Sequence, residues 1–197
     1  KEHDGRTLNG GDLVHQCAPP RKKAKGGPKW HKISKVVERL GRKTYLVDDG
    51  KRRTQHHIDN LKDFSLGEKI IGHLEVNPVI IQNAEQHFGE IKDLDYQAID
   101  FDVFSPVWDD KIVWIGYPGR DQLDHVITYI AKRKCQVAYV IVPELPFEDW
   151  FKTLDAIPDA LWFGVRPGDG PDFWLAEDKR VAMTPPITWF IVKVIGQ

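Results

Sequence analysis

Short alternating runs of apolar and polar residues, separated by turn residues, fill the first 65 positions. Runs of this kind predict strands rather than helices. Two tight turns are predicted, at 41–43 and at 48–51, where an Asp-Gly pair favours a hairpin. The predicted strands cover 13–15, 30–40, 44–47 and 52–58. The residues that follow, up to Leu61, bring the count to five short strands in about 60 residues. This number of short strands indicates a small all-β barrel, in which near closure of the sheet protects its edges.

From residue 77 onward, segments with a helical period alternate with continuous apolar runs. Asn77 and Pro78 predict the N-cap and the first turn of a helix that ends at Gly89, and Asp121 predicts the cap of a second helix. The apolar faces of these helices comprise Val79, Ile80, Ala84 and Phe88, and Leu123, Val126, Ile127 and Ile130. A third helix is predicted over 147–157, and strands over 91–96, 111–115, 136–142, 160–165 and 188–195. This alternation predicts an α/β sheet that is covered on both faces.

Composition is typical of a folded, water-soluble chain, with 41% apolar and 29% charged residues. No apolar run approaches the ~18 residues that a membrane helix needs. The first residues lack the apolar stretch of a signal peptide. Cys17 and Cys135 form no CxxC pair, which disfavours a disulfide scaffold and fits a reducing compartment. We therefore expect a nuclear or cytoplasmic location and no membrane partner.

Charge is divided unevenly along the chain. Residues 1–65 hold 16 lysines and arginines against 8 aspartates and glutamates, whereas residues 66–197 hold 12 against 21. The two parts carry net charges of +8 and −9, which predicts a basic part for a polyanion and an acidic part with another task. We expect a multi-domain chain, with a basic barrel over 1–66 and an acidic α/β domain over 70–197. Two small domains that merely differ in charge are the alternative.

The basic part offers candidate phosphate-binding side chains in a lysine-rich loop and beside a hairpin turn. Lysines and arginines that neutralise phosphates release counterions, and they give salt-sensitive, sequence-independent affinity for the DNA backbone. The predicted DNA-binding residues are Arg21, Lys22, Lys23, Lys25, Lys29, Lys32, Lys51, Arg52 and Arg53. No metal site is expected, because the adjacent His56 and His57 point to opposite faces of a strand and no cysteine pair is present.

The motifs of the basic part follow one another in a known order. They are Gly-Asp-Leu-Val at 11–14, Pro-Lys-Trp at 28–30, Leu-Gly-x-x-Thr-Tyr-Leu-Val at 40–47, Asp-Asp-Gly at 48–50 and His-x-Asp-x-Leu-Lys at 57–62. Over residues 10–64 the chain resembles the C-terminal SH3-like barrel of integrases from gypsy-class LTR retrotransposons and retroviruses. It departs at 30–33, where Trp-His-Lys-Ile replaces the frequent Trp-x-Gly-Pro-Tyr. The resemblance implies non-specific DNA binding, help in positioning DNA ends and target DNA, contact with host chromatin proteins in some members, and a catalytic core upstream.

The acidic part, over residues 77–195, is similar in its order of elements to phage-type DNA adenine methyltransferases. The order is a strand ending in a proline motif, a helix, an apolar strand ending in Val-Pro, a tryptophan-containing helix and two late strands. These enzymes carry Asp/Asn-Pro-Pro-aromatic after the fourth strand, to hold and stack the flipped base. The corresponding residues here are Gly116, Tyr117, Pro118 and Gly119, which lack the acceptor and the final ring. The resemblance implies a degenerate Rossmann-like domain, and no cofactor is expected, because no glycine-rich loop follows the strand expected near 94–98.

These observations predict a non-catalytic, C-terminal part of a retroelement integrase that binds the DNA backbone. The acidic domain would be a protein-interaction appendage, for which the six tryptophans after residue 66 offer anchors. An adenine methyltransferase-like enzyme, and a chromatin or protein-interaction module without DNA binding, stay open as alternatives, as do self-association and the reading of histone tails. A two-metal nuclease is disfavoured, because its candidate ligands form a dense, loop-like run: Asp93, Asp95, Asp100, Asp102, Asp109 and Asp110.

Overall fold

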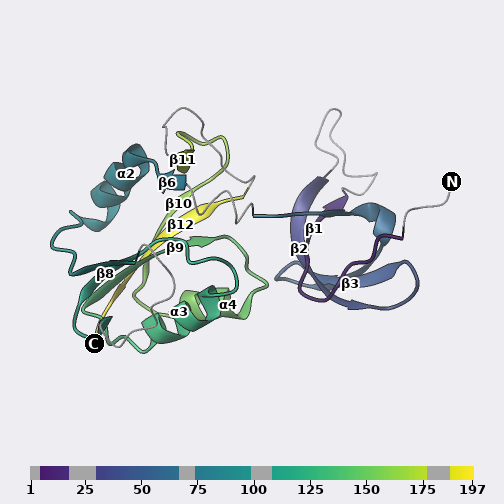
Figure 1. Cartoon of the computed structure of the whole chain (residues 1–197), viewed down its shortest axis with the longest axis horizontal. Coiled ribbons are helices and arrows are strands. Elements are labelled where there is room, and N and C mark those ends of the chain that lie inside the picture. Colours follow the sequence, from purple (N-terminus) through teal and green to yellow (C-terminus); the bar gives the residue numbers. More distant parts are fainter. Residues whose placement is uncertain (1–4, 18–29, 67–73, 99–107, 177–186) are drawn as a thin grey trace. The chain divides into compact units, whose positions relative to one another are not determined.

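The computed structural model describes residues 5–17, 30–66, 74–98, 108–176 and 187–197. Within these residues the protein is mainly β-sheet with three α-helices, a mixed α/β architecture. The chain divides into two compact units (Figure 1). Unit 1 comprises Lys1–Leu66 and Pro146–Glu148, and unit 2 comprises Gly67–Leu145 and Asp149–Gln197. None of the helices in the described ranges is long and apolar enough to cross a membrane.

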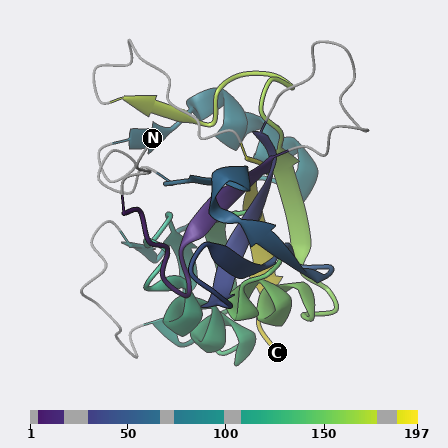
Figure 2. The same ribbon diagram turned by 90° about the vertical axis from the view of Figure 1, so that its right-hand side faces the viewer.

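Unit 1 is built on one antiparallel five-stranded sheet, drawn in purple to blue in Figure 2. The strands are β1 Leu13–Cys17, β2 Trp30–Arg39, β3 Thr44–Asp48, β4 Arg53–His57 and β5 Leu61–Asp63. Their order across the sheet is β4-β3-β2-β1-β5. The first four strands confirm the segments predicted from the alternating pattern. The fifth, β5, has only three residues and one buried side chain, so no pattern locates it in the sequence.

Alternate side chains of the unit 1 strands meet in a small core. Its buried members are Leu8, Val14, Val36, Tyr45, Val47 and Leu61. The hydroxyl of Tyr45 accepts a hydrogen bond from the backbone N–H of Leu8 at 3.2 Å. This bond ties the residues that precede β1 to the centre of the sheet.

The strand predicted over 52–58 ends at His57, where a short 3-10 helix, η2, covers Ile58–Asn60. The imidazole Nδ1 of His57 accepts a hydrogen bond from the backbone N–H of Asp59 at 3.2 Å and caps this turn. The backbone N–H of Ile58 donates to the carbonyl of Lys43 at 2.9 Å. The turn redirects the chain into β5, which pairs with β1 and not with β4.

Unit 2 is built on a mixed five-stranded sheet of order β10-β12-β9-β8-β7. Its strands are β7 Tyr96–Ala98, β8 Ile112–Ile115, β9 Val137–Pro143, β10 Leu161–Val165 and β12 Trp189–Ile195. The strands β7, β8 and β9 are parallel, and β12 lies antiparallel between β9 and β10. A separate antiparallel pair joins β6 Leu74–Val76 to β11 Trp174–Ala176, and β11 had not been predicted.

Three helices cover the two faces of this sheet. They are α2 Pro78–Phe88, α3 Leu123–Ala131 and α4 Asp149–Asp155. Figure 1 shows α3 and α4 on one side of the sheet and α2 on the other. On the α2 side, the ring centroid of Phe88 lies 6.1 Å from Tyr139 and 6.4 Å from Phe163. On the α4 side, Phe151 lies 5.5 Å from Trp162, so neighbouring residues of β10 contact opposite layers, as expected for a sheet covered on both faces.

The cap of α2 confirms its prediction, and the cap of α3 does not. The side chain of Asn77 accepts the N–H of Val79 at 3.0 Å, but the side chain of Val79 is 47% exposed instead of joining the apolar face. In α3 the apolar stripe is buried as predicted, yet the N-cap is Gln122, without a side-chain hydrogen bond, and Asp121 does not cap the helix. A capping residue type near a helix start is therefore a weaker signal than the apolar stripe.

The bounds 91–96 predicted for the next strand are wrong, because residues 91–95 form no strand, but β7 at Tyr96–Ala98 lies within the segment 94–98 where a strand was also expected. Asp93 has a φ of 55°, a left-handed conformation that breaks an extended segment. The carboxylate of Asp95 accepts a hydrogen bond from the backbone N–H of Ile112 at 2.8 Å, and the backbone N–H of Asp95 donates to the carbonyl of Ile112 at 2.9 Å, so this segment contacts β8 just before β7 begins.

Candidate nucleic-acid interface

Five of the nine predicted DNA-binding residues lie outside the described residues. These five are Arg21, Lys22, Lys23, Lys25 and Lys29. The other four gather at one end of the unit 1 sheet. Lys32 belongs to β2, while Lys51, Arg52 and Arg53 lie in the β3–β4 turn and at the start of β4.

In the β3–β4 turn, one carboxylate oxygen of each of the two aspartates accepts hydrogen bonds from the backbone of the turn. Asp48 Oδ1 accepts the N–H of Gly50 at 2.8 Å. Asp49 Oδ1 accepts the N–H of Lys51 at 2.8 Å and of Arg52 at 3.0 Å. Gly50 has a φ of 90°, a conformation that glycine adopts without strain. The side chains exposed by this turn are Lys51, Arg52 and Arg53.

Two of the predicted DNA-binding residues form ion pairs at this turn. Lys32 Nζ lies 2.5 Å from Asp49 Oδ2, and the Asp49 side chain is only 3% exposed. Burial raises the pKa of Asp49, but hydrogen bonds from Lys32 and from two backbone amides of the turn outweigh burial and lower this pKa to about 2. Arg53 Nε lies 3.4 Å from Asp48 Oδ2. The other two cations of the turn, Lys51 and Arg52, form no ion pair with a carboxylate among the described residues.

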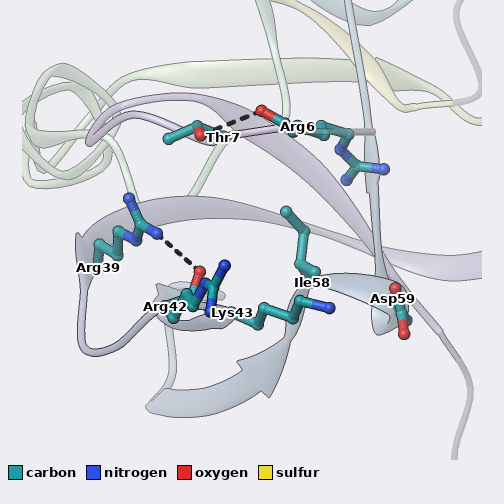
Figure 3. Close-up of a pocket in the computed structure, with 8 residues that line it drawn as sticks. Arg6, Thr7, Arg39, Arg42, Lys43, Ile58 and Asp59 are labelled. Carbon is teal, nitrogen blue, oxygen red and sulfur yellow. Dashed lines mark hydrogen bonds between the residues drawn. The ribbon is translucent and has the colours of Figure 1, made fainter. Parts of the chain in front are cut away.

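A second cationic surface, which we call the β2–β3 pocket, lies at the other end of β3 (Figure 3). Its volume is about 340 Å³. The lining residues are Gly5, Arg6, Thr7, Arg39, Arg42, Lys43, Ile58 and Asp59. Four cationic side chains against one carboxylate make the pocket a concave, net positive site, which concentrates anions.

The walls of the β2–β3 pocket are held by specific contacts. Arg39 donates from Nε and Nη2 to two backbone carbonyls of the β2–β3 turn, at 2.9 and 2.7 Å. Arg6 donates from Nη2 to a backbone carbonyl at the start of β5 at 2.6 Å, and lies 3.7 Å from Asp63. Arg42 and Lys43 are exposed, and neither side chain pairs with a carboxylate in the described part of the chain. These two cations are therefore available to a ligand.

The β2–β3 pocket contains none of the nine predicted DNA-binding residues. Sequence analysis assigned Arg42 and Lys43 to a hairpin turn without a functional role, although two adjacent cations in a turn were a usable signal. Arg6 and Arg39 are 33 positions apart, and they come together only because β1, β2 and β5 form one sheet. No spacing rule would have joined them.

In unit 2, the segment that was compared with the methyltransferase motif, residues 116–119, follows β8. An added Cβ at Gly116 would meet nothing within 4 Å, so the absence of a side chain there is not imposed by crowding at the Cβ position. Tyr117 is 7% exposed, and its ring meets Trp189 edge-on at 5.1 Å. Pro118 is buried as well. Gly119 has a φ of 85°, which a residue with a side chain rarely adopts.

Tyr117 belongs to a buried aromatic cluster at the end of the unit 2 sheet. The ring of Trp189, fully buried, lies 5.9 Å from Phe173 and 5.2 Å from Trp174. The tryptophans after residue 66 that are at most 8% exposed are Trp108, Trp114, Trp150, Trp174 and Trp189. Most tryptophans that had been offered as interface anchors are thus part of the core.

The described aspartates of the 93–110 segment make separate contacts with the protein. Asp95 binds a backbone N–H of β8, and Asp109 accepts a hydrogen bond from the hydroxyl of Tyr129. Asp100 and Asp102 lie outside the described residues, as does the segment after β7 where a cofactor loop was not expected. In the described ranges, no three or more metal-ligating side chains are grouped.

Comparisons with protein-family models, with curated proteins and with solved structures find no match. The assignment of a function therefore depends on the chemistry of the two cationic surfaces and of the segment after β8.

Proposed function

We propose that this chain is a non-catalytic part of a retroelement integrase that binds the DNA backbone through unit 1. The observation that carries the proposal is the pair of cationic surfaces at the two ends of β3, both with exposed charges that no described carboxylate neutralises. Exposed lysines and arginines on a small rigid sheet are suited to phosphate contacts, which give affinity without sequence preference. DNA as the partner implies a nuclear or cytoplasmic place of action.

The order of strands in unit 1 supports an SH3-like barrel of the integrase type. Five short antiparallel strands, with a 3-10 turn before the last and the last paired to the first, make a compact sheet with a single core. Four of the five motifs quoted for the resemblance fall on its strands and turns, while Pro28 and Lys29 of the fifth lie outside the described residues. We infer that unit 1 is a domain of this kind and that it folds independently of unit 2.

For unit 2 we propose a Rossmann-like, methyltransferase-like domain that has no enzymatic activity. The succession of β8, α3, β9, α4, β10 and β12 is the order on which the resemblance depends. Gly116 provides no side-chain acceptor, and the ring of Tyr117 is packed against Trp189 instead of being free to stack on a base. The acidic surface of this unit then serves protein recognition.

Salt-dependent DNA binding tests the proposal. The dissociation constant of the full chain for a random-sequence duplex is measured by fluorescence anisotropy over a range of salt concentrations. Two paired variants are compared: Lys51→Gln with Arg52→Gln at the β3–β4 turn, and Arg42→Gln with Lys43→Gln at the β2–β3 pocket. Each pair should reduce the slope of log K against log salt by about 1 to 2, because each phosphate contact contributes about 0.9.

Lys134→Gln provides the matched control, because Lys134 is an exposed cation of unit 2. It should leave the slope unchanged. A slope that neither paired variant alters, or an absence of duplex binding at low salt, would contradict the proposal. Calorimetric titration of the same chain with S-adenosylmethionine tests the second part, and saturable micromolar binding would favour the methyltransferase alternative.

A further inference from the structure

The composition of the β2–β3 pocket is not that of a site for phosphate alone. Asp59 lines the pocket together with the four cations, and a carboxylate repels a phosphate. Ile58 also lines the pocket, and its half-buried side chain packs against the unit 1 core. Figure 3 shows Ile58 extending from η2 toward the Arg6–Thr7 segment, between the two walls. A ligand that matches this lining has an anionic group for the cations, an apolar face for Ile58 and a hydrogen-bond donor for Asp59.

A nucleotide has these three properties. Its phosphate suits Arg42 and Lys43, which have no carboxylate partner among the described residues. Its base offers an apolar face to Ile58, and a planar face to the guanidinium of Arg39, which two backbone hydrogen bonds hold in place. The amino or imino N–H of a base can donate to Asp59.

A base inside a continuous duplex cannot make these contacts, because it is stacked and paired, and only its phosphates face outward. A concave site of about 340 Å³ is of the size that takes a small ligand. An unpaired nucleotide at a strand end or in an overhang can enter such a site.

We propose that the β2–β3 pocket binds one unpaired nucleotide of a DNA strand, and that it gives the chain a preference for duplexes with a single-stranded overhang. This inference rests on the proposed function and adds a substrate class to it. The β3–β4 turn, whose exposed charged side chains are all cations, would contact the paired backbone without this preference.

Two DNAs with equal numbers of phosphates test the inference, one blunt and one with a short overhang on a shortened duplex. The full chain should bind the overhang DNA about fivefold or more tightly, since stacking one base on a protein side chain contributes about 1 kcal/mol or more. Asp59→Asn should remove most of this preference while blunt-duplex binding stays equal or becomes tighter, because a negative charge is lost. Lys51→Gln with Arg52→Gln should lower the affinity of the chain for both DNAs by the same factor.

The outcomes separate this inference from the proposed function. Equal affinity for both DNAs, or a preference that survives both Asp59→Asn and Arg42→Gln with Lys43→Gln, would overturn the pocket assignment and leave backbone binding intact. A chain that binds neither DNA at low salt would overturn both. All substituted side chains are exposed, and near-ultraviolet circular dichroism that matches the parent protein checks that each variant is folded.

Discussion

Unit 1 and unit 2 differ in the size of their cores and in the charge of their side chains. Unit 1 has a core of six buried apolar residues, and its distinctive chemistry lies in exposed cations at two turns. Unit 2 buries most of its tryptophans, and residues 66–197 carry a net charge of −9. A small sheet is sufficient to present charges, whereas unit 2 has a larger core, and the segment after its strand β8 has glycines at positions 116 and 119. We therefore expect single surface substitutions to affect ligand binding by unit 1, and core substitutions to affect mainly the stability of unit 2.

The largest expected effect comes from the core of unit 2. Trp189→Ala removes a fully buried ring that contacts Tyr117, Phe173 and Trp174, and it should reduce the free energy of unfolding of unit 2 by about 3 to 5 kcal/mol. Hydrogen exchange resolved along the chain measures this loss. The protection of unit 1 amides and the affinity for duplex DNA should remain within twofold of the parent protein.

Trp162→Ala is the matched control, since Trp162 is only half-buried on the other face of the sheet. It should reduce the free energy of unfolding of unit 2 by less than Trp189→Ala does. If Trp189→Ala also removes protection from unit 1, the two units share one cooperative core, and the comparison between them fails.

The next effect concerns acid stability in unit 1. The pKa of Asp49 is about 2 in the folded protein, below its value of 3.8 in an unconstrained chain. The ionised carboxylate therefore stabilises the folded state above about pH 4, and this contribution is lost as the pH falls from 3.8 toward 2. Asp49→Asn should reduce the stability of unit 1 at pH 7 by up to about 2 kcal/mol, at about 1.4 kcal/mol per pKa unit.

Urea unfolding at a series of pH values checks this prediction, and the difference between the parent protein and Asp49→Asn should narrow below pH 4. Asp63→Asn serves for comparison, because the Asp63 side chain is 68% exposed and lies 3.7 Å from Arg6. A surface pair of this kind contributes about 0 to 1 kcal/mol. A difference for Asp49→Asn that does not depend on pH would mean that the Lys32 ion pair is not its source.

Sequence patterns located most of the longer helices and strands, and missed short strands such as β5 and β11 and the sites that the fold assembles. The spacing of Leu123, Val126, Ile127 and Ile130 predicted the buried stripe of α3, because each element must bury its own apolar side. The β2–β3 pocket could not be predicted in the same way. Its residues come from three separate segments, and only strand pairing joins them.

Local chemistry was also ambiguous where a side chain had two uses. Lys32 was predicted to bind DNA from its charge, yet it forms an ion pair with a buried aspartate that the sequence places 17 positions away. The tryptophans of the acidic part were interpreted as interface anchors, but ring packing buries most of them. Charge and aromatic content suggest a function class, whereas burial decides which side chains are available for it.

A smaller effect is expected at the hydrogen bond between Tyr45 and Leu8. Tyr45→Phe leaves the N–H of Leu8 without its partner at 3.2 Å, and it should reduce the stability of unit 1 by about 1 kcal/mol. Tyr139→Phe in unit 2 is the control, because the hydroxyl of Tyr139 makes no hydrogen bond to the described residues. Urea unfolding followed by hydrogen exchange distinguishes the two units, and equal losses for both variants would contradict the role given to the Tyr45 hydroxyl.

The smallest effect is expected at Gly116. An added Cβ there meets nothing within 4 Å, so Gly116→Asn should change the stability of unit 2 by less than about 0.5 kcal/mol. The variant restores an amide acceptor in the motif, but Gly119 still provides no ring and Tyr117 stays packed against Trp189. Binding of S-adenosylmethionine and methyl transfer to DNA should therefore stay undetectable, measured by calorimetry and with a labelled methyl donor. A Gly116→Asn variant that methylates adenine would show that unit 2 lacks one side chain rather than a whole site, and the contrast drawn between the two units would then hold only for their surfaces.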